Sequence, residues 1–303
     1  MDAWPDLSYT AWKDTYATLL LWTQIVGKIR LVQTPWVNHS WHVVYYVTAR
    51  GLSTSPIRYG ERVFEMDFDF IDHQLLIRTG EGQLRTVRLE PRTVADFYHA
   101  VMAQLAALEL GVAINTTPNE QVEAIPFERD DKHRSYDAQA VGRFFAALLQ
   151  ADRVLKEFRA RFHGKCSPVH FFWGGFDLAV TRFSGRPAPE HPGGVPHLPD
   201  RVAREAYSHE VSSCGFWPGN EVLPEAAFYA YAYPEPEGFK NAGAGPAAYY
   251  HPDLREFILP YDKVRQASSP DTMLLHFLQR THEAAATLGR WEDAGGRALV
   301  PKA

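Results

Sequence analysis

The sequence has few cysteines, no excess of basic residues and no long apolar run. Cys166 and Cys214 are its only cysteines, too few for a disulfide framework, so we expect a reducing, cytoplasmic location. A net charge of −5 offers no broad basic surface for a phosphate backbone, and nucleic acid is not an expected partner. The apolar residues 19–22 are followed by Gln24 and Lys28, which favours an amphipathic helix over a signal peptide or membrane span.

Aromatic residues, in contrast, are abundant. They make up 13% of the 303 residues and include eight tryptophans, which predicts large buried clusters or a pocket with aromatic walls. A chain of this length is long for one hydrophobic core and sufficient for two.

Residues 9–32 carry apolar side chains at helical spacing and predict a helix that Pro35 ends. Thr93 followed by Asp96 resembles a capping box and predicts a second helix from there to about residue 108. Four extended segments are expected between these helices, at residues 41–49, 62–70, 74–79 and 84–89.

The same order of elements returns after a polar segment at residues 115–136. Asp137 is the expected cap of a long helix that Pro168 ends, and Ser269-Pro270 starts the last helix. Strands are expected between them at residues 169–181, 207–216, 228–233 and 256–259.

This repetition predicts an α+β fold of two diverged helix–four-strand–helix repeats, with antiparallel sheets packed by long helices about a pseudo-twofold axis. The first repeat spans residues 1–114, the polar linker 115–136 and the second repeat 137–303. A shift of 128 residues supports the duplication, because it aligns Leu20, Leu21, Val26 and Lys28 with Leu148, Leu149, Val154 and Lys156. A pocket between the repeats is then the default site.

The second repeat carries a glycine pair, Gly174 and Gly175, inside an aromatic segment. Such a pair indicates a bulge, a close approach by a ligand or another backbone, or a tight crossing of sheet and helix. Strand alternation over residues 169–182 places His170 on one face with Arg182, and Asp177 on the other.

The next strand places His209 on one face and Glu210 on the other, with Cys214. One pocket would therefore contain His170 and Arg182 with either His209 or Glu210. Farther along, Tyr229, Tyr231 and Tyr233 share one strand face and either line a pocket or cover the sheet.

Three chemistries fit these residue types. The two histidines with a carboxylate suit a divalent transition metal, although no metal-binding motif is present, and no other cofactor is indicated. A histidine-activated cysteine nucleophile is the second, without a supporting motif. In the third, histidine and glutamate are acid–base groups and Arg182 anchors an anionic substrate.

Our hypothesis is a small-molecule pocket in the second repeat, with His170, His209, Glu210 and Arg182 as catalytic candidates. The proline- and glycine-rich loop at 184–206 would cover it. The predicted pocket residues are Phe172, Trp173, Gly174, Gly175, Asp177, Cys214, Phe216 and Trp217. The alternatives that stay open are a non-catalytic ligand-sensing or protein-interaction module using the aromatic strands, and a duplication without a site.

Four segments, residues 21–28, 163–186, 207–219 and 228–236, resemble an uncharacterised family of bacterial proteins, a domain of unknown function. The resemblance spans most of the chain, from about residue 22 to about residue 291. It implies family membership and no particular activity.

Overall fold

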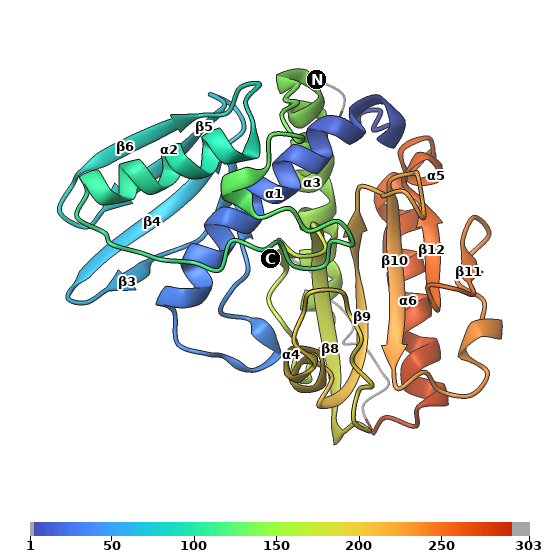
Figure 1. Cartoon of the computed structure of the whole chain (residues 1–303). Coiled ribbons are helices and arrows are strands. Elements are labelled where there is room, and N and C mark those ends of the chain that lie inside the picture. The colour runs from blue at the N-terminus through green and yellow to red at the C-terminus, as the bar shows by residue number, and fades with distance from the viewer. Residues whose placement is uncertain (1–2, 293–303) are drawn as a thin grey trace, which may run out of the picture.

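The computed structural model describes residues 3–292 and contains two six-stranded antiparallel sheets with long helices between and behind them (Figure 1). The predicted α+β class is confirmed. The expectation of four strands in each unit is wrong, because each sheet also includes short strands that carry little periodicity. Residues 1–2 and 293–303, the outer ends of the two predicted repeats, lie outside the described residues.

The first half begins with α1 (Tyr9–Gln33) and ends with α2 (Val94–Ala107). Thr93 accepts a hydrogen bond from the backbone N–H of Asp96 at 3.0 Å, which confirms the predicted start of α2. The sheet runs in the order β1-β2-β4-β5-β6, and β3 also pairs with β4. Its strands are β1 (Tyr46–Val47), β2 (Gly51–Ser53), β3 (Ile57–Tyr59), β4 (Arg62–Asp69), β5 (Gln74–Thr79) and β6 (Leu84–Arg88).

The second half begins with α3 (Ala138–Ala160), capped by Asp137 as expected, and ends with α6 (Pro270–Leu288). Two short helices, α4 (Asp200–Ala206) and α5 (Tyr261–Arg265), lie between them. The sheet order is β11-β12-β10-β9-β8-β7. Its strands are β7 (His170–Phe172), β8 (Asp177–Pro187), β9 (His209–Trp217), β10 (Ala227–Tyr233), β11 (Tyr249–His251) and β12 (Glu256–Pro260).

Residues 169–181, expected as one strand, form a hairpin instead. The chain reverses at residues 173–176, where the glycine pair and Phe176, with a φ of 56°, make the turn between β7 and β8. His170 pairs with Ala179, so the turn changes which residues share a face. His170 therefore lies on the face of Asp177, and Arg182 lies on the opposite one, contrary to the predicted arrangement.

Helix α1 lies between the two halves (blue, Figure 1) and is buried around most of its circumference. Its Trp22 stacks on Phe97 of α2, with ring centroids 4.5 Å apart. On the other side, a Cβ added at Gly27 would lie 2.4 Å from the Trp173 ring, so this tryptophan packs directly on the helix backbone. Both halves thus share one core through α1.

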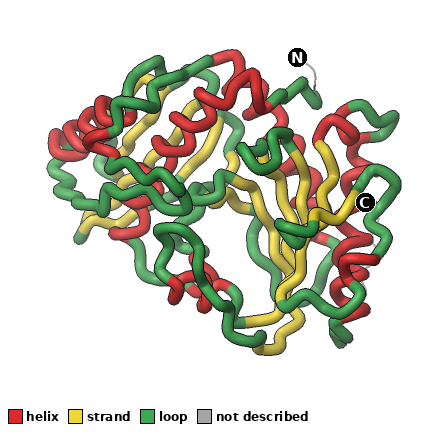
Figure 2. The backbone as a smooth tube through the Cα atoms, turned by 45° about the vertical axis from the view of Figure 1, so that its right-hand side comes forward, coloured by secondary structure: helices red, strands yellow, loops and turns green. Residues whose placement is uncertain are grey.

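The two sheets meet at a single bridge, where the backbone amides of Tyr45 and Phe171 each donate to the other residue's carbonyl at 2.8 Å. Helices α3 and α6 pack on one face of the second sheet. Figure 2 shows loops (green) passing in front of the strands on the side away from these helices. This loop-covered face holds the candidate site.

Candidate functional site

A cleft of about 1670 Å³ lies over the loop-covered face of the second sheet. Its walls come from α1, the segment after α2, the β7–β8 turn, β9, β10 and the region of α4. The cleft exceeds the usual 300–1,000 Å³ or so of a small-molecule pocket, so it has room for a ligand and water.

The pairing register decides which side chains reach this face. Residue pairs directly opposite each other on neighbouring strands point to the same side of a sheet. By that criterion the cleft face carries the polar side chains Asp177, Thr181, Ser213, Tyr229, Tyr231 and Glu256. The opposite face carries Leu178, Val180, Phe216 and Phe228, which pack toward α3 and α6. One face is thus apolar and the other is rich in hydroxyl and carboxyl groups.

Hydroxyl groups link the polar side chains across three strands. Tyr229 of β10 donates to Oδ2 of Asp177 on β8 at 2.5 Å. The hydroxyls of Tyr207 and Tyr231 share a hydrogen bond of 2.9 Å. The Tyr229 hydroxyl thereby orients the carboxyl group of Asp177.

Glu120 enters the cleft from the segment predicted as a linker and lies against the glycine pair. A Cβ added at Gly174 would lie 1.9 Å from Oε1 of Glu120, so any other residue there would require the Glu120 carboxyl group to move. A Cβ at Gly175 would lie 2.8 Å from Oδ1 of Asp177 and 4.0 Å from Oε2 of Glu120. The glycines therefore admit two carboxyl groups to one place, as their sequence position suggested for a close approach.

Two contacts fix Glu120 in this position. Gln24 of α1 exchanges hydrogen bonds with the backbone of Asn119, at 2.9 and 2.8 Å. The backbone N–H of Glu120 itself donates to the carbonyl of Pro196 at 3.0 Å. The proline-rich segment at 184–206 thus borders the cleft, although β8 and α4 take up its two ends.

Glu120, Asp177 and Glu256 form what we call the acidic group. Each carboxyl has a raised pKa: about 7 for Glu120, about 6 for Asp177 and about 8 for Glu256. Loss of surrounding water inside the cleft is the main cause for all three, and the nearby Asp177 raises the pKa of the other two further. Part of each side chain still reaches solvent, since Asp177 and Glu256 are half-buried and Glu120 is exposed. Within residues 3–292, none of them forms an ion pair. Near neutral pH the acidic group therefore retains protons that ordinary carboxylates would have lost.

The segment Asn38–Ser40 forms another edge of the cleft, and its backbone is strained. His39 and Ser40 have left-handed φ values of 59° and 56°, which non-glycine residues rarely adopt outside functional or tightly constrained sites. Nδ1 of His39 lies 2.8 Å from the carbonyl of Ala206, so this nitrogen carries the proton and Nε2 is a free acceptor. The His39 side chain is 4% exposed, and its Nε2 has no partner among the described residues.

The predicted catalytic residues do not converge. His170 is buried beside Trp41 and Phe172, its pKa is lowered to about 3 by burial and by Arg30, and it does not line the cleft. Arg182 lies on the helix side, with its guanidinium 3.4 Å from the Phe158 ring centroid.

His209 and Glu210 do point to opposite faces of β9, as alternation predicted. Glu210 accepts from Arg186 on the side away from the cleft, at 2.6 Å. The His209 ring lies 5.9 Å from that of His39, which places it near the strained segment.

The predicted pocket residues divide between the two faces. The cleft is lined by Phe172, Trp173, Gly174, Gly175, Asp177 and Trp217. Phe216 and Cys214 instead belong to the helix-side core, because alternation on β9 turns them away from Trp217. Burial raises the pKa of the Cys214 thiol and raises that of Cys166 to about 11, so both stay as thiols that are poor nucleophiles.

Sequence reasoning missed Glu120, Glu256 and His39. The glycine pair was the one signal for Glu120, because it indicated a close approach without naming the partner. Within residues 3–292, no three histidine, cysteine, aspartate or glutamate side chains are arranged to hold a metal ion. No helix in the same range has the length and apolar character needed to cross a membrane.

The fold and site define an α+β protein with two antiparallel sheets and a cleft lined by carboxyl, hydroxyl and aromatic groups. The chain belongs to DUF5996, a family of unknown function whose model matches residues 4–297. No curated protein and no solved structure matches it.

Proposed function

We propose that the protein binds a small molecule in this cleft and transfers protons to or from it through Asp177 and Glu120. The observation that supports this most is the pair of carboxyl groups that meet at Gly175, with pKa values near neutrality. General acid–base catalysis works best when the pKa of the group lies near the operating pH. His209 is a further candidate at the edge near His39, whereas His170, Arg182 and Glu210 are not.

The alternative use of the aromatic strands as a partner surface has less support. The side chains of Phe216, Phe228 and Tyr229 are at most 7% exposed, so the strands offer little apolar surface to another protein. A non-catalytic ligand sensor would use the same cleft and differ only in the absence of turnover.

A ligand screen tests the proposal, with binding monitored by thermal shift and ligand-detected NMR. We expect molecules that bind the wild type to bind Asp177→Asn or Tyr229→Phe at least fivefold more weakly. Tyr250→Phe is the matched control, since Tyr250 donates to a carboxylate, Glu235, at 2.6 Å without lining the cleft. Binding that is equal in all variants would rule out the cleft as the site.

We also infer that the two halves derive from one duplicated unit, since each begins with a long helix, continues as a six-stranded antiparallel sheet and ends in a helix. Superposition of residues 9–107 on residues 138–288 tests the duplication. Backbone agreement no better than that between unrelated α+β folds would contradict it. A cytoplasmic location is proposed from the two free thiols and is tested by cell fractionation.

A further inference from the structure

Three hydrogen-bond acceptors that reach the cleft have no donor among the described residues. The carboxyl groups of Glu120 and Glu256 make no hydrogen bond or ion pair with any other described residue. Nε2 of His39, buried and unpartnered, is an acceptor because Nδ1 is committed to Ala206. A buried acceptor without a donor, such as Nε2 of His39, is costly, and a ligand that supplies a donor removes that cost. Glu120 is exposed and Glu256 is half-buried, so both carboxyl groups are accessible to such a ligand.

The protein's own cations leave the acidic group uncompensated. Those that line the cleft are Lys13, Lys28, Lys132, Arg134 and Arg201, and none forms an ion pair with the acidic group. The ammonium group of Lys28 is directed elsewhere, since it donates to the carbonyl of Thr117 at 2.7 Å. Lys132 pairs with Glu123 at 2.5 Å.

The aromatic walls of the cleft suit a ligand that donates hydrogen bonds and carries a positive charge. Trp41 and Trp217 line the cleft and are half-buried, and the face of an indole ring attracts a cation through its electron density. The protein itself makes one such contact, since the ammonium group of Lys165 lies 5.8 Å from the Trp41 ring centroid. Carboxyl groups beside aromatic faces therefore provide both the charge and the contact surface that an organic cation needs.

We propose that the cleft recognises an organic cation, an amine whose N–H groups are received by Glu120, Asp177 and Glu256. The assignment rests on the proposed function, since it names the ligand class of that same cleft. His39 accepts a further donor of the ligand through Nε2.

Proton release accompanies binding. A cation favours the ionised form of the carboxyl groups, so protons that the acidic group holds near pH 6.5 pass to solvent when the amine enters. The other titratable side chains that face the acidic group are Tyr16 from α1, Tyr207 before β9, and Tyr229 and Tyr231 from β10. All four have raised pKa values, chiefly through burial, and stay neutral.

Three series of probes test the proposal by isothermal titration calorimetry. The amines are pentane-1,5-diamine, spermidine and 2-phenylethylamine; pentane-1,5-diol is the neutral match, and glutarate the anionic match. We expect at least one amine to bind, the diol at least tenfold more weakly and glutarate not at all. Titration at pH 6.5 in phosphate and in MES, which differ in ionisation heat, should show net proton release.

Substitutions test whether the acidic group is where the amine binds. Glu256→Gln should weaken amine binding at least fivefold and reduce the proton release, while Asp67→Asn, on the first sheet, should change neither. Cation recognition is overturned if the diol or glutarate binds as tightly as the amines, if Glu256→Gln and Asp177→Asn leave amine binding unchanged, or if no amine binds. If the diol or glutarate binds as tightly as the amines but Asp177→Asn abolishes that binding, the cleft is still a small-molecule site, although not one for cations.

Discussion

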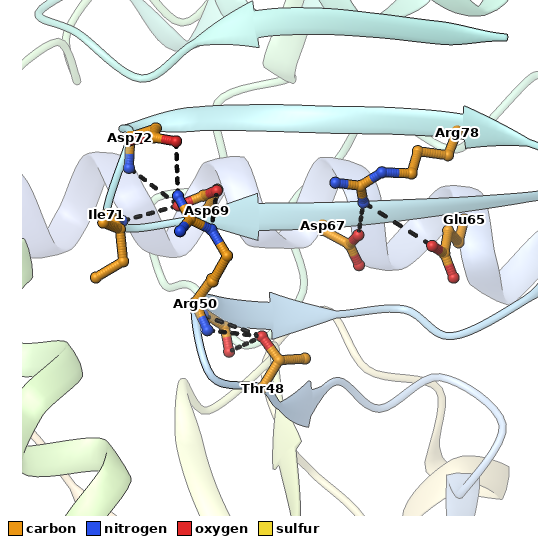
Figure 3. Close-up of polar contacts among 9 residues, drawn as sticks. Thr48, Arg50, Glu65, Asp67, Asp69, Ile71, Asp72 and Arg78 are labelled. Carbon is orange, nitrogen blue, oxygen red and sulfur yellow. Dashed lines mark hydrogen bonds and ion pairs between the residues drawn. The ribbon is translucent and has the colours of Figure 1, made fainter. Parts of the chain in front are cut away.

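The first sheet and the cleft face of the second sheet differ in how their carboxyl groups are paired. On the first sheet, arginines lie beside the acidic side chains, as Figure 3 shows: Arg50 contacts Asp69 at 2.7 Å and Arg78 contacts Asp67. On the second sheet, Asp177 and Glu256 have no such partner among the described residues. Similar strand alternation thus produces paired carboxylates on the first sheet and unpaired carboxyl groups with raised pKa values on the cleft face of the second.

The local surroundings explain the difference. Burial alone would raise the pKa of Asp69, but hydrogen bonds from Arg50 and from the N–H groups of Asp72 and Ile71 lower it overall. Asp177 receives hydrogen bonds from Tyr229 and from its own backbone N–H but none from a cation, and burial dominates its pKa. The comparison indicates that a sheet acid without a cation keeps a raised pKa, whereas a paired one is held in its ionised form.

The largest expected effect is a loss of stability when the contact between α1 and Trp173, at the wall of the cleft, is overpacked. Gly27→Ala places a Cβ 2.4 Å from the buried Trp173 ring and should lower the free energy of unfolding by about 1–3 kcal/mol. Urea denaturation measures it. Gly142→Ala, in α3 with nothing within 4 Å of the added Cβ, is the control and should raise stability by up to about 1 kcal/mol. Equal effects of both substitutions would contradict the packing argument.

Asp69→Asn removes a paired acid from the first sheet. It should cost about 2 kcal/mol at pH 7, because charge-assisted hydrogen bonds are lost. A carboxyl group whose pKa is lower in the folded state than in the unfolded state stabilises the fold at pH values above the unfolded-state pKa. This contribution disappears as the pH falls through the folded-state pKa. Denaturation at pH 3 should therefore show a smaller difference from the wild type, and an unchanged one would be inconsistent with an ion pair.

Asp177→Asn should change the free energy of unfolding in the opposite direction. The folded-state pKa of about 6 exceeds the usual value of 3.8, so the wild type loses stability as pH rises from about 4 to 6. The variant lacks this penalty and should be more stable by about 1–2 kcal/mol at pH 8, with little difference at pH 4. Denaturation curves at both pH values measure this, and a destabilised variant at pH 8 would contradict the raised pKa.

The smallest effect is expected from Tyr229→Phe, which removes the one hydroxyl that donates to Asp177. The pKa of Asp177 should rise above about 6, since the ionised form loses a donor. Carboxyl ¹³C chemical shifts followed through a pH titration measure it. Tyr250→Phe should leave the titration of Asp177 unchanged, and a pKa that falls in Tyr229→Phe would reverse the assignment.

Much of the fold follows from local sequence. Pro35, Thr93 and Asp137 mark helix boundaries correctly because caps and prolines act over a few residues. The hairpin at residues 170–179 was not predicted because its aromatic strands are short and none of the interpretations of the glycine pair was a chain reversal. That error placed Arg182 in the pocket, since a turn reverses the parity on which face assignments depend.

By itself the sequence determined the α+β class, the main helices, the polar–apolar alternation of β9 and β10, and the importance of Gly174 and Gly175. Only the tertiary structure decided what the glycines admit, because Glu120 is far from them in the chain and reaches them through contacts with Gln24 and Pro196. Local spacing specifies which way a side chain points on its own strand. Which segments meet across the cleft depends on packing between distant parts of the chain, and this is why the acidic group emerged only from the fold.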